Sequence, residues 1–452
     1  MTFFFEKKCV TLRLKIKKMD NFKYKNGKLF CEDIDLELLS CVQTPFYLYS
    51  WNTFKDHFLR FKESFRELNP LICFAVKTCN NLAILKGLAE LGAGMDIVSG
   101  GELFQSVRAG VSPGKIVFAG VGKTVDEIEF AIENGLGFFN IESEPEFIRI
   151  EKIAKQKNKV MTALLRVNPD EYDIKTHVKT TTGKKGGKFG VDYEDVSLFF
   201  NKYGKSHFIK LDGLHIHLGS PIYSAQPYEK AIDKMISLIN TLTLKGFDIK
   251  YLDIGGGFAA DYEDDSAPSW GEYASGIVPL LKPLVDKGIK IIIEPGRTIA
   301  ANAGILVCSV QYVKKTNHGK DIIIVDTGMN HLIRPAMYNA NHFIWPVDTK
   351  KSFSVIKRKF ELSLDGLVEC DIAGQICESG DYLAKNRKIP PVSSSDRLAI
   401  FTAGAYGMVM SSQYNSQCRP AEYLVDKDKL TMIRKRETYE DLVNNNCEIK
   451  CV

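Results

Sequence analysis

The sequence lacks the features that would place the protein in a membrane or on nucleic acid. No apolar stretch in its 452 residues is long enough for a helix to cross a bilayer. Residues 1–8 are basic and apolar, but charges interrupt them before the apolar core of a signal peptide forms. The 60 basic and 55 acidic residues leave a net charge of +5, without a cluster of Lys and Arg dense enough for nucleic acid. We therefore expect neither a membrane protein nor a partner of nucleic acid.

Cysteine pairs and metal-binding patterns are also missing. The eleven cysteines are an odd number, and none forms a CxxC pair or stands near histidines at metal-ligand spacing. Scattered cysteines of this kind are typical of reduced thiols, so we expect a cytoplasmic protein without a metal site. Met19 is a candidate start, with residues 1–18 then a dispensable extension.

Most of the chain alternates between short apolar segments and amphipathic helical patterns such as 82–91 and 125–133. Alternation of this kind predicts βαβ units and a parallel sheet. Eight such segments favour a closed (β/α)₈ barrel of the TIM type over an open doubly wound sheet. The strands are expected at residues 71–76, 95–98, 115–119, 137–141, 161–167, 212–218, 250–254 and 289–294.

A second domain is expected after the barrel, because the pattern changes there. Strands without intervening helices are predicted at 305–313, 321–325, 367–372 and 397–401, which indicates an all-β sandwich or barrel. Short strand-like pieces between residues 22 and 50 are expected to pack with it. The expected domains are residues 1–43 with the β domain, the barrel over 44–300 and the β domain over 301–452.

Polar residues and glycines stand where the barrel strands are expected to end, which is where such barrels carry their chemistry. Lys77 directly follows the first strand, and burial there is expected to lower the pKa of its amine and favour the nucleophilic form. A lysine at a strand end more often only extends its stem over the apolar rim. The other residues at this rim are Asp96, Arg166, His217, Ser220, Gly255, Gly256, Gly257 and Glu294.

Three of these features suggest a phosphorylated ring cofactor. The glycine triplet lets the backbone approach an anion closely, although a flexible turn is the simpler interpretation. The carboxylate of Glu294, at the end of an apolar strand, needs a partner, either Arg297 or a protonated pyridine nitrogen. His217 is either a hydrogen-bonded core histidine or a residue that stacks on a flat ring. With Lys77, these residues describe a site for pyridoxal 5'-phosphate.

At this point the sequence resembles the fold-type III pyridoxal phosphate-dependent decarboxylases, and within them the diaminopimelate decarboxylase family. The resemblance extends from about residue 44 to residue 425. The matching segments are Phe74–Thr78 (FAVKT), Asp96–Glu102 (DIVSGGE), His215–Ser220 (HIHLGS), Gly255–Phe258 (GGGF), Glu294–Arg297 (EPGR), Met329–Tyr338 (MNHLIRPAMY), Cys377–Asp381 (CESGD) and Ala403–Gly407 (AGAYG).

The resemblance implies that the protein decarboxylates meso-2,6-diaminopimelate to L-lysine and CO2, the last step of lysine biosynthesis. It makes Lys77 the residue that holds the cofactor covalently, with Asp96, Arg166, His217, Ser220, Gly255, Gly256, Gly257, Glu294, Gly296, Arg297 and Tyr406 around it. It assigns substrate binding to Arg297, Arg334, Tyr338, Glu378 and Tyr406. Cys377 is the candidate proton donor, or else an ordinary buried cysteine. Cys377 and Glu378 would come from the second subunit of a homodimer.

Two other classes stay open on the residues alone: a decarboxylase of ornithine, arginine or carboxynorspermidine (or a racemase on the same barrel), and a non-catalytic carrier of pyridoxal phosphate. Arg334 and Tyr338 favour diaminopimelate, because its far end carries a carboxylate, whereas ornithine and arginine carry only a cation there. The sequence departs from the family pattern at His331, Asn339, Asn341 and Gln417–Cys418, where an acidic residue, glycine, tyrosine and Arg-Pro are usual.

Overall fold

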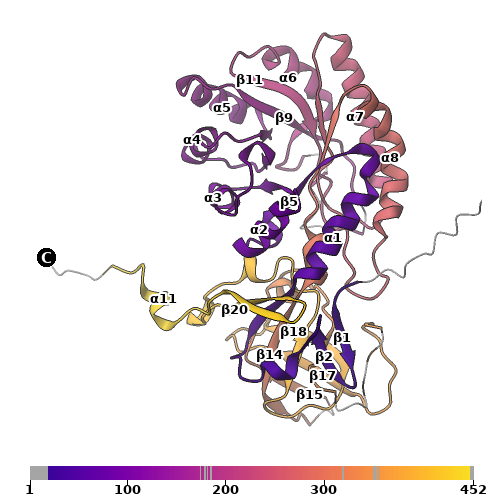
Figure 1. Ribbon diagram of the computed structural model, residues 1–452, viewed down its shortest axis with the longest axis vertical. Coiled ribbons are helices and arrows are strands. Elements are labelled where there is room, and N and C mark those ends of the chain that lie inside the picture. Colours follow the sequence, from indigo (N-terminus) through magenta and orange to yellow (C-terminus); the bar gives the residue numbers. More distant parts are fainter. Residues whose placement is uncertain are drawn as a thin grey trace, which may run out of the picture.

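The computed structural model describes residues 19–447 apart from 174, 178–179, 181, 184–185, 318–319, 350–352, 354 and 356. The candidate extension, residues 1–18, lies outside this range. The chain forms a barrel wrapped by helices and, against one end of it, a domain built on a mixed sheet (Figure 1). Among the described helices, none combines the length and the apolar character that a membrane span requires.

The barrel has the eight parallel strands that the alternating pattern predicts, and the pairing of β8 with β9 closes it. The sixth strand lies three residues earlier than predicted, so His217 and Ser220 fall in the loop beyond it. A short strand, β10 (Val191–Asp192), adds to β9. In chain order the barrel strands are β5 (Leu71–Ala75), β6 (Gly94–Ile97), β7 (Ile116–Phe118), β8 (Phe138–Ile141), β9 (Met161–Asn168), β11 (Ile209–His215), β12 (Tyr251–Asp253) and β13 (Lys290–Ile293).

Amphipathic helices cover the outside of the barrel, and several begin at a side-chain cap. Ser50, Asn81, Ser99 and Thr124 each accept a hydrogen bond from a backbone N–H in the first turn of their helix. The covering helices are α1 (Trp51–Ser64), α2 (Leu82–Glu90), α3 (Gly100–Arg108), α4 (Val125–Glu133), α5 (Glu144–Gln156), α6 (Val196–Tyr203), α7 (Gln226–Leu244) and α8 (Trp270–Asp286).

Inside the barrel an apolar layer is followed by a polar one. Cys73, Val117, Phe138, Leu164 and Ile292 form a buried apolar cluster. Residues two positions apart on a strand share a face, so positions two residues further along the strands also point inward. At that level, towards the carboxyl ends of the strands, lie the buried side chains of Asp96, Asn140, Arg166, His215, Asp253 and Glu294. The strand period therefore creates a buried polar layer at one end of the barrel.

The second domain is a mixed sheet in the order β18-β17-β15-β14-β4-β20-β21, where β4 is Phe46–Ser50; β19 also pairs with β14, and β16 pairs with β19. The four strands predicted after residue 305 are confirmed as β14 (Gly304–Lys314), β15 (Asp321–Val325), β17 (Val368–Ala373) and β19 (Arg397–Ile400). The strands that were not predicted are β16 (Ile344–Pro346), β18 (Tyr382–Ile389), β20 (Ala421–Asp426) and β21 (Lys429–Arg434).

The strand-like segment before residue 50 packs with the β domain, as expected, so the barrel begins later than the expected boundary at residue 44. The barrel was expected over residues 44–300, but β4 (Phe46–Ser50) pairs with β14 on one side and β20 on the other. Every residue of β4 is buried, so it forms the middle of this sheet before the chain enters α1. The preceding strands β1 (Phe22–Lys25), β2 (Lys28–Cys31) and β3 (Ile34–Asp35) form a small sheet. It is bonded to the β domain through Leu29 and Val347, as expected.

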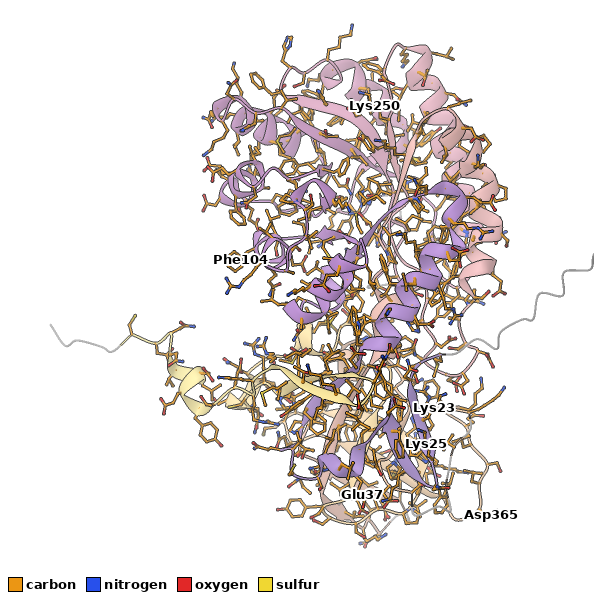
Figure 2. The ribbon with its side chains drawn as sticks, viewed as in Figure 1. Lys23, Lys25, Glu37, Phe104, Lys250 and Asp365 are labelled. Atoms are coloured by element: carbon orange, nitrogen blue, oxygen red, sulfur yellow. The ribbon has the colours of Figure 1, made fainter. Side chains whose placement is uncertain are left out.

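The β domain covers the end of the barrel at which the strands finish. Lys250, directly before β12, lies at the far end of the barrel, whereas Lys23, Lys25 and Glu37 lie in the region of the β domain (Figure 2). At the near end, the backbone N–H of Tyr406 donates to the carbonyl of Thr78, next to Lys77, over 2.9 Å. The polar layer of the barrel therefore faces residues of the β domain.

A buried carboxyl group also joins the two domains. Glu422, on β20, accepts hydrogen bonds from the hydroxyl of Tyr49 at 2.7 Å and from Nδ2 of Asn81, the cap of α2, at 2.8 Å. Its side chain is almost completely excluded from water. Because buried donors need acceptors, this carboxyl fixes β20 and β4 against the barrel.

We expect Glu422→Ala to lower the free energy of unfolding by about 2–3 kcal/mol, because it leaves two buried donors without their acceptor. Glu422→Gln is the matched control, since its amide can accept from Asn81 and donate to the hydroxyl of Tyr49. Urea unfolding followed by circular dichroism measures both. Equal losses in the two variants would show that the hydrogen bonds at Glu422 do not hold the domains together.

Candidate active site

Lys77 lies in the short turn that follows β5, at the mouth of the barrel, and its amine contacts a buried carboxylate. Nζ is 2.6 Å from Oδ2 of Asp96, whose side chain is fully buried, while the side chain of Lys77 is 31% exposed. The amine of Lys77 is thus held by the polar layer, while part of the side chain is still exposed at the mouth of the barrel. A reactive lysine needs this combination of a fixed position and an open side.

The pKa of Lys77 moves in the opposite direction to the sequence-based prediction. Burial lowers it, but the negative charges of Asp96 and Glu294 outweigh burial and raise the pKa above its usual value. The prediction considered burial alone, whereas the fold brings two carboxyl groups to the amine. Without a ligand, Lys77 is therefore a stable ammonium. Burial and the charge of Glu294 raise the pKa of Asp96 to about 7 although Lys77 opposes them.

Glu294 is surrounded by Asp253, His215 and Asn140 rather than by Arg297. His215 Nε2 lies 3.6 Å from Oε2 of Glu294, and Nδ2 of Asn140 lies 3.4 Å from Oε1. Polar atoms of His215, Asp253 and Glu294 all lie within 4.8 Å of one another. The alternative in which Arg297 pairs with Glu294 does not occur.

The pKa values of the two neighbouring carboxyl groups of this cluster, Asp253 and Glu294, are shifted in opposite directions. Burial and the charge of Glu294 raise the pKa of Asp253 well above its usual range. Burial also acts to raise the pKa of Glu294, but His215, Lys77 and the hydrogen bond with Asp253 hold it below the usual range. Burial keeps His215 neutral by lowering its pKa. Asp253 therefore holds the proton of the pair, and Glu294 carries the negative charge.

The glycine triplet follows β12 and approaches neighbouring backbone closely. A Cβ on Gly256 would lie 2.1 Å from the carbonyl oxygen of Glu294, and Gly255 and Gly257 have positive φ angles. Two of its three backbone N–H groups already have acceptors within the protein. The N–H of Gly255 donates to Oδ1 of Asp253 at 2.8 Å, and that of Gly256 donates to Nδ1 of His217 at 3.2 Å. The triplet thus also orients the ring of His217.

Arg166 is held within the polar layer by a carboxylate that the sequence analysis did not single out. Its guanidinium lies 2.7 Å from Oε1 of Glu142 and covers the ring of Phe189. Glu142 also accepts from the backbone N–H groups of Gly120 and Gly190. Arg166 is therefore a fixed part of the wall. Together with burial, its charge lowers the pKa of His217 and keeps that ring neutral.

Arg297 connects the loop after β13 with the loop after β11. Its Nε donates to the hydroxyl of Ser220 at 3.1 Å, and its Nη1 donates to the hydroxyl of Tyr262 at 2.9 Å. The guanidinium also lies 4.8 Å from the ring centre of Tyr406, from the β domain. Gly296 lets this segment pack on Thr78, because a Cβ there would lie 2.5 Å from the methyl group of that residue.

Arg334, the first residue of α10 (Arg334–Tyr338), brings a second guanidinium from the β domain. Nη1 lies 3.0 Å from Nε2 of His342, and the guanidinium covers the ring of Tyr262 at 4.9 Å. Arg297 and Arg334 are both 7% exposed. Within the described part of the chain, neither forms a salt bridge with a carboxylate. Two buried cations without an anion describe a site for a carboxylate ligand. Tyr338, at the end of α10, packs its ring against His177.

Cys377 and Glu378 do not join this cluster in their own chain. Both are exposed. The backbone N–H of Cys377 donates to Oδ1 of Asn415 at 2.8 Å, and the carboxylate of Glu378 accepts from the hydroxyl of Tyr414. In the described residues, neither makes a contact with Lys77. The cysteine is thus not buried, in contrast to the alternative expectation, and the pair faces outward from its own subunit.

The loop that carries this pair is anchored by Asp381. The carboxylate accepts from the backbone N–H of Ile376 at 2.7 Å and from that of Met329 at 2.6 Å. Glycine is required at two neighbouring positions, because a Cβ on Gly374 or Gly328 would lie within 2.6 Å of the same carboxylate. Asp381 therefore joins the loop of Cys377 to the segment that leads to Arg334.

The departures from the family pattern are compatible with this arrangement. Asn339 ends α10 in the left-handed conformation with φ of 53°, which asparagine tolerates nearly as well as the usual glycine. Asn341 accepts a hydrogen bond from Arg387 at 2.5 Å. His331 contacts the other altered segment, because its Nε2 lies 3.1 Å from the carbonyl oxygen of Cys418. Two of the changes thus meet in space.

Several residues at the site were missed in the sequence analysis. The strand period was a usable signal for some of them, since Asn140 and Asp253 follow inward-facing strand residues by two positions. Tyr262 and His342 lie in loops, and no local signal identifies them. The missed residues are Asn140, Glu142, His215, Asp253, Tyr262 and His342.

Several buried polar atoms of the polar layer are available to form hydrogen bonds with a ligand. Oδ1 of Asp96, Oδ1 of Asn140 and both ring nitrogens of His215 are buried without a hydrogen-bond partner in the described residues. Buried polar atoms in this state indicate a missing polar ligand. Lys77 lies at the mouth of the barrel, and Glu294 in the polar layer is ionised. Together with these unpaired atoms, they fit a flat ring that carries a positive nitrogen and polar substituents, as pyridoxal phosphate does.

Fold and site together define a pyridoxal-dependent decarboxylase, and comparison with known proteins agrees. Residues 51–301, more than half of the chain, match the family described as pyridoxal-dependent decarboxylase, pyridoxal binding domain. The diaminopimelate decarboxylase of Aquifex aeolicus is 44% identical over 430 residues, which are 94% of this chain and 97% of the relative. The chain therefore belongs to the diaminopimelate decarboxylase family.

Solved structures of the family have the same architecture. The crystal structure of diaminopimelate decarboxylase from Helicobacter pylori complexed with L-lysine is 38% identical with a TM-score of 0.82, and the match covers 90% of this chain and 98% of that one. The M. jannaschii enzyme in co-complex with L-lysine is 33% identical with a TM-score of 0.87, covering 95% and 98%. The barrel with a β domain is thus the family fold.

We expect acid to destabilise the protein partly through His331. Burial lowers its pKa to about 4, so between pH 6.5 and pH 4 the unfolded chain binds a proton that the folded chain refuses. Stability therefore falls as the pH drops through this window, by up to about 1.4 kcal/mol per pH unit for one group. Unfolding measured between pH 7 and pH 4.5 should show a smaller loss for His331→Gln.

The exposed His207 provides the matched control, and His207→Gln should keep the wild-type pH dependence. If His331→Gln and the wild type lose stability in parallel, His331 is not a neutral buried histidine.

Proposed function

We propose that this protein decarboxylates meso-2,6-diaminopimelate to L-lysine and CO2 with pyridoxal 5'-phosphate as its cofactor. One observation carries the proposal. A lysine that contacts a buried carboxylate lies at the same end of the barrel as two buried guanidiniums, which have no carboxylate partner in the described chain. The first part suits a cationic ring, and the second suits a substrate with a carboxylate at its far end.

The cofactor would be held by residues from the whole barrel mouth. Lys77 would bind it covalently, Glu294 would face the ring nitrogen, and His217 would stack on the ring. Ser220, Gly255–Gly257, Gly296, Arg297 and Tyr406 would surround the phosphate, with Asp96 and Arg166 in the supporting wall. Bound pyridoxal phosphate supplies an electron sink for the carbanion that remains when CO2 leaves.

The buried cluster gives Glu294 a defined role in this chemistry. Its pKa lies below the usual range while that of Asp253 lies well above it, so the negative charge stays on Glu294. An ionised carboxylate at this position favours a protonated ring nitrogen, which makes the ring a better electron acceptor. Lys77 must release its proton to act, and Asp96, whose pKa is raised to about 7, is the nearest acceptor.

Substrate choice would depend on Arg297 and Arg334, with Tyr338 and Tyr406 beside them. Both guanidiniums would bind the distal carboxylate of diaminopimelate, which ornithine and arginine lack. Arg334 comes from the β domain and Arg297 from the barrel. A substrate would therefore have to reach from Lys77 to the junction of the two domains. The relatives in complex with L-lysine support this assignment, because lysine retains that carboxylate.

Cys377 and Glu378 would complete the site from the partner subunit of a homodimer. Their exposure on an anchored loop supports this arrangement. Cys377 would deliver a proton to the carbon that loses CO2, and Glu378 would lie near the distal amine. The protein would work in the cytoplasm, where the nine cysteines of the described residues stay free thiols.

Release of CO2 from a panel of amino acids tests the function directly. The protein loaded with pyridoxal phosphate should act on meso-diaminopimelate with a kcat/KM about ten- to a hundredfold above that for lysine, ornithine or arginine, since a charged hydrogen bond contributes about 1.5–3 kcal/mol. Lys77→Ala should abolish release from every substrate. A preference for ornithine or arginine would contradict the carboxylate pocket.

Mixing two inactive variants tests the shared site. Lys77→Ala and Cys377→Ala should each be inactive alone, whereas an equal mixture with free subunit exchange should recover about a quarter of the wild-type activity, because half of the dimers then contain one complete site. Native mass spectrometry verifies that heterodimers form. Heterodimers without activity would place Cys377 and Lys77 of the same chain in one site.

A further inference from the structure

We propose that His342 is a positioning residue that directs Arg334 toward the carboxylate of the substrate without neutralising its charge. The inference rests on the proposed role of Arg334 and deepens it. It comes from three juxtaposed side chains. His342 contacts Arg334, Arg334 covers the ring of Tyr262, and Tyr262 bonds to Arg297.

The neighbours of His342 determine which nitrogen carries the proton. Nδ1 lies 2.9 Å from the carbonyl oxygen of Phe401, which can only accept, so Nδ1 carries hydrogen. Nε2 lies 3.0 Å from Nη1 of Arg334, which can only donate, so Nε2 is bare. The imidazole is therefore neutral and in a single tautomer. Burial and the charge of Arg334 agree with this state, since they lower the pKa of His342 to about 3.

The ring of His342 is fixed as firmly as its protonation. Its side chain is 1% exposed, and it packs edge-on against Tyr262 with ring centres 5.6 Å apart. The backbone around it is fixed as well, because the N–H of Phe401 donates to the carbonyl of Phe343 at 2.8 Å. His342 thus holds Arg334 against a fixed part of the β domain.

A neutral acceptor does what an acidic residue at this position could not. A carboxylate beside Arg334 would form an ion pair and satisfy the guanidinium before substrate arrives. A neutral imidazole occupies one N–H and leaves the full positive charge for an incoming anion. The flexible side chain is also ordered in advance, so less conformational entropy is lost on binding.

Tyr262 completes the support by contacting both guanidiniums. Its hydroxyl accepts from Arg297 while its ring face lies under Arg334. Burial acts to raise the pKa of Tyr262, but the two arginines outweigh burial and lower the pKa below the usual value. The phenol therefore interacts with both cations.

Binding of two diamines to the protein loaded with pyridoxal phosphate tests the inference. L-Lysine retains the distal carboxylate, and cadaverine lacks it. Calorimetry should show that His342→Phe, which keeps a ring but loses the acceptor, weakens lysine binding about tenfold and changes cadaverine binding less than twofold. His342→Gln, whose amide oxygen can accept from Arg334, should recover most of the lysine affinity.

His57→Phe is the matched control. His57 is buried like His342 and also contacts backbone carbonyls, those of Met19 and Ile299, but in the described part of the chain it makes no hydrogen bond with an arginine. This variant should bind both diamines as the wild type does. A parallel loss of lysine and cadaverine affinity in His342→Phe, or no loss of either, overturns the inference.

Arg334→Ala separates this inference from the proposed carboxylate pocket. If Arg334→Ala leaves the ratio of lysine to cadaverine affinity unchanged, the pocket itself is wrong. If it lowers the ratio and His342→Phe does not, only the positioning role fails. Adding His342→Phe to Arg334→Ala should cause no further loss, because His342 acts through Arg334.

A measurement on the wild type keeps the inference testable if His342→Phe does not fold. Neutron diffraction from deuterated crystals locates the hydrogens of buried imidazoles directly. Deuterium on Nδ1 of His342 alone is the expected result. Deuterium on Nε2 would remove the acceptor for Arg334 and overturn the assignment.

Discussion

The arrangement of the active site depends on an imbalance of buried charge at the mouth of the barrel. Asp96, Asp253 and Glu294 are all excluded from water, and Lys77 contacts Asp96 and interacts with the charge of Glu294. The cluster can exist only because Asp253 holds a proton and because Lys77 stays charged. It therefore attracts a second cation, and a protonated pyridine ring supplies one. The preference for the cofactor is thus a property of the barrel before any ligand enters.

The β domain creates the opposite imbalance a short distance away. Arg334 joins Arg297 there, with Tyr262 and His342 as neutral supports. This second pole is not complete in the barrel alone, because Arg334 and His342 come from the β domain. The buried bonds of Glu422 keep the two domains in register. Under the proposed function, the first pole binds the cofactor and the second binds the distal carboxylate of the substrate.

Much of this architecture can be predicted from the sequence, because strand period and strand-end chemistry are local properties. The eight barrel strands were predicted in this way, and so was the position of Lys77 at the rim. The direction of its pKa was wrong, since that depends on Asp96 and Glu294, which only the fold brings near. The boundary at residue 44 was set too early, because β14 and β20, the partners of β4, are distant in sequence. Tyr262 and His342 could not be predicted for the same reason.

One carboxylate has a consequence for how two sites in a dimer would behave. Asp381 holds the backbone of Met329, near Arg334, and the backbone of Ile376, next to Cys377. If Arg334 serves the site of its own subunit and Cys377 serves that of the partner, one side chain connects the two sites. A shift of Arg334 on substrate binding would then be passed to the proton donor of the neighbouring site. Turnover at one site would then change how readily Cys377 donates its proton at the other.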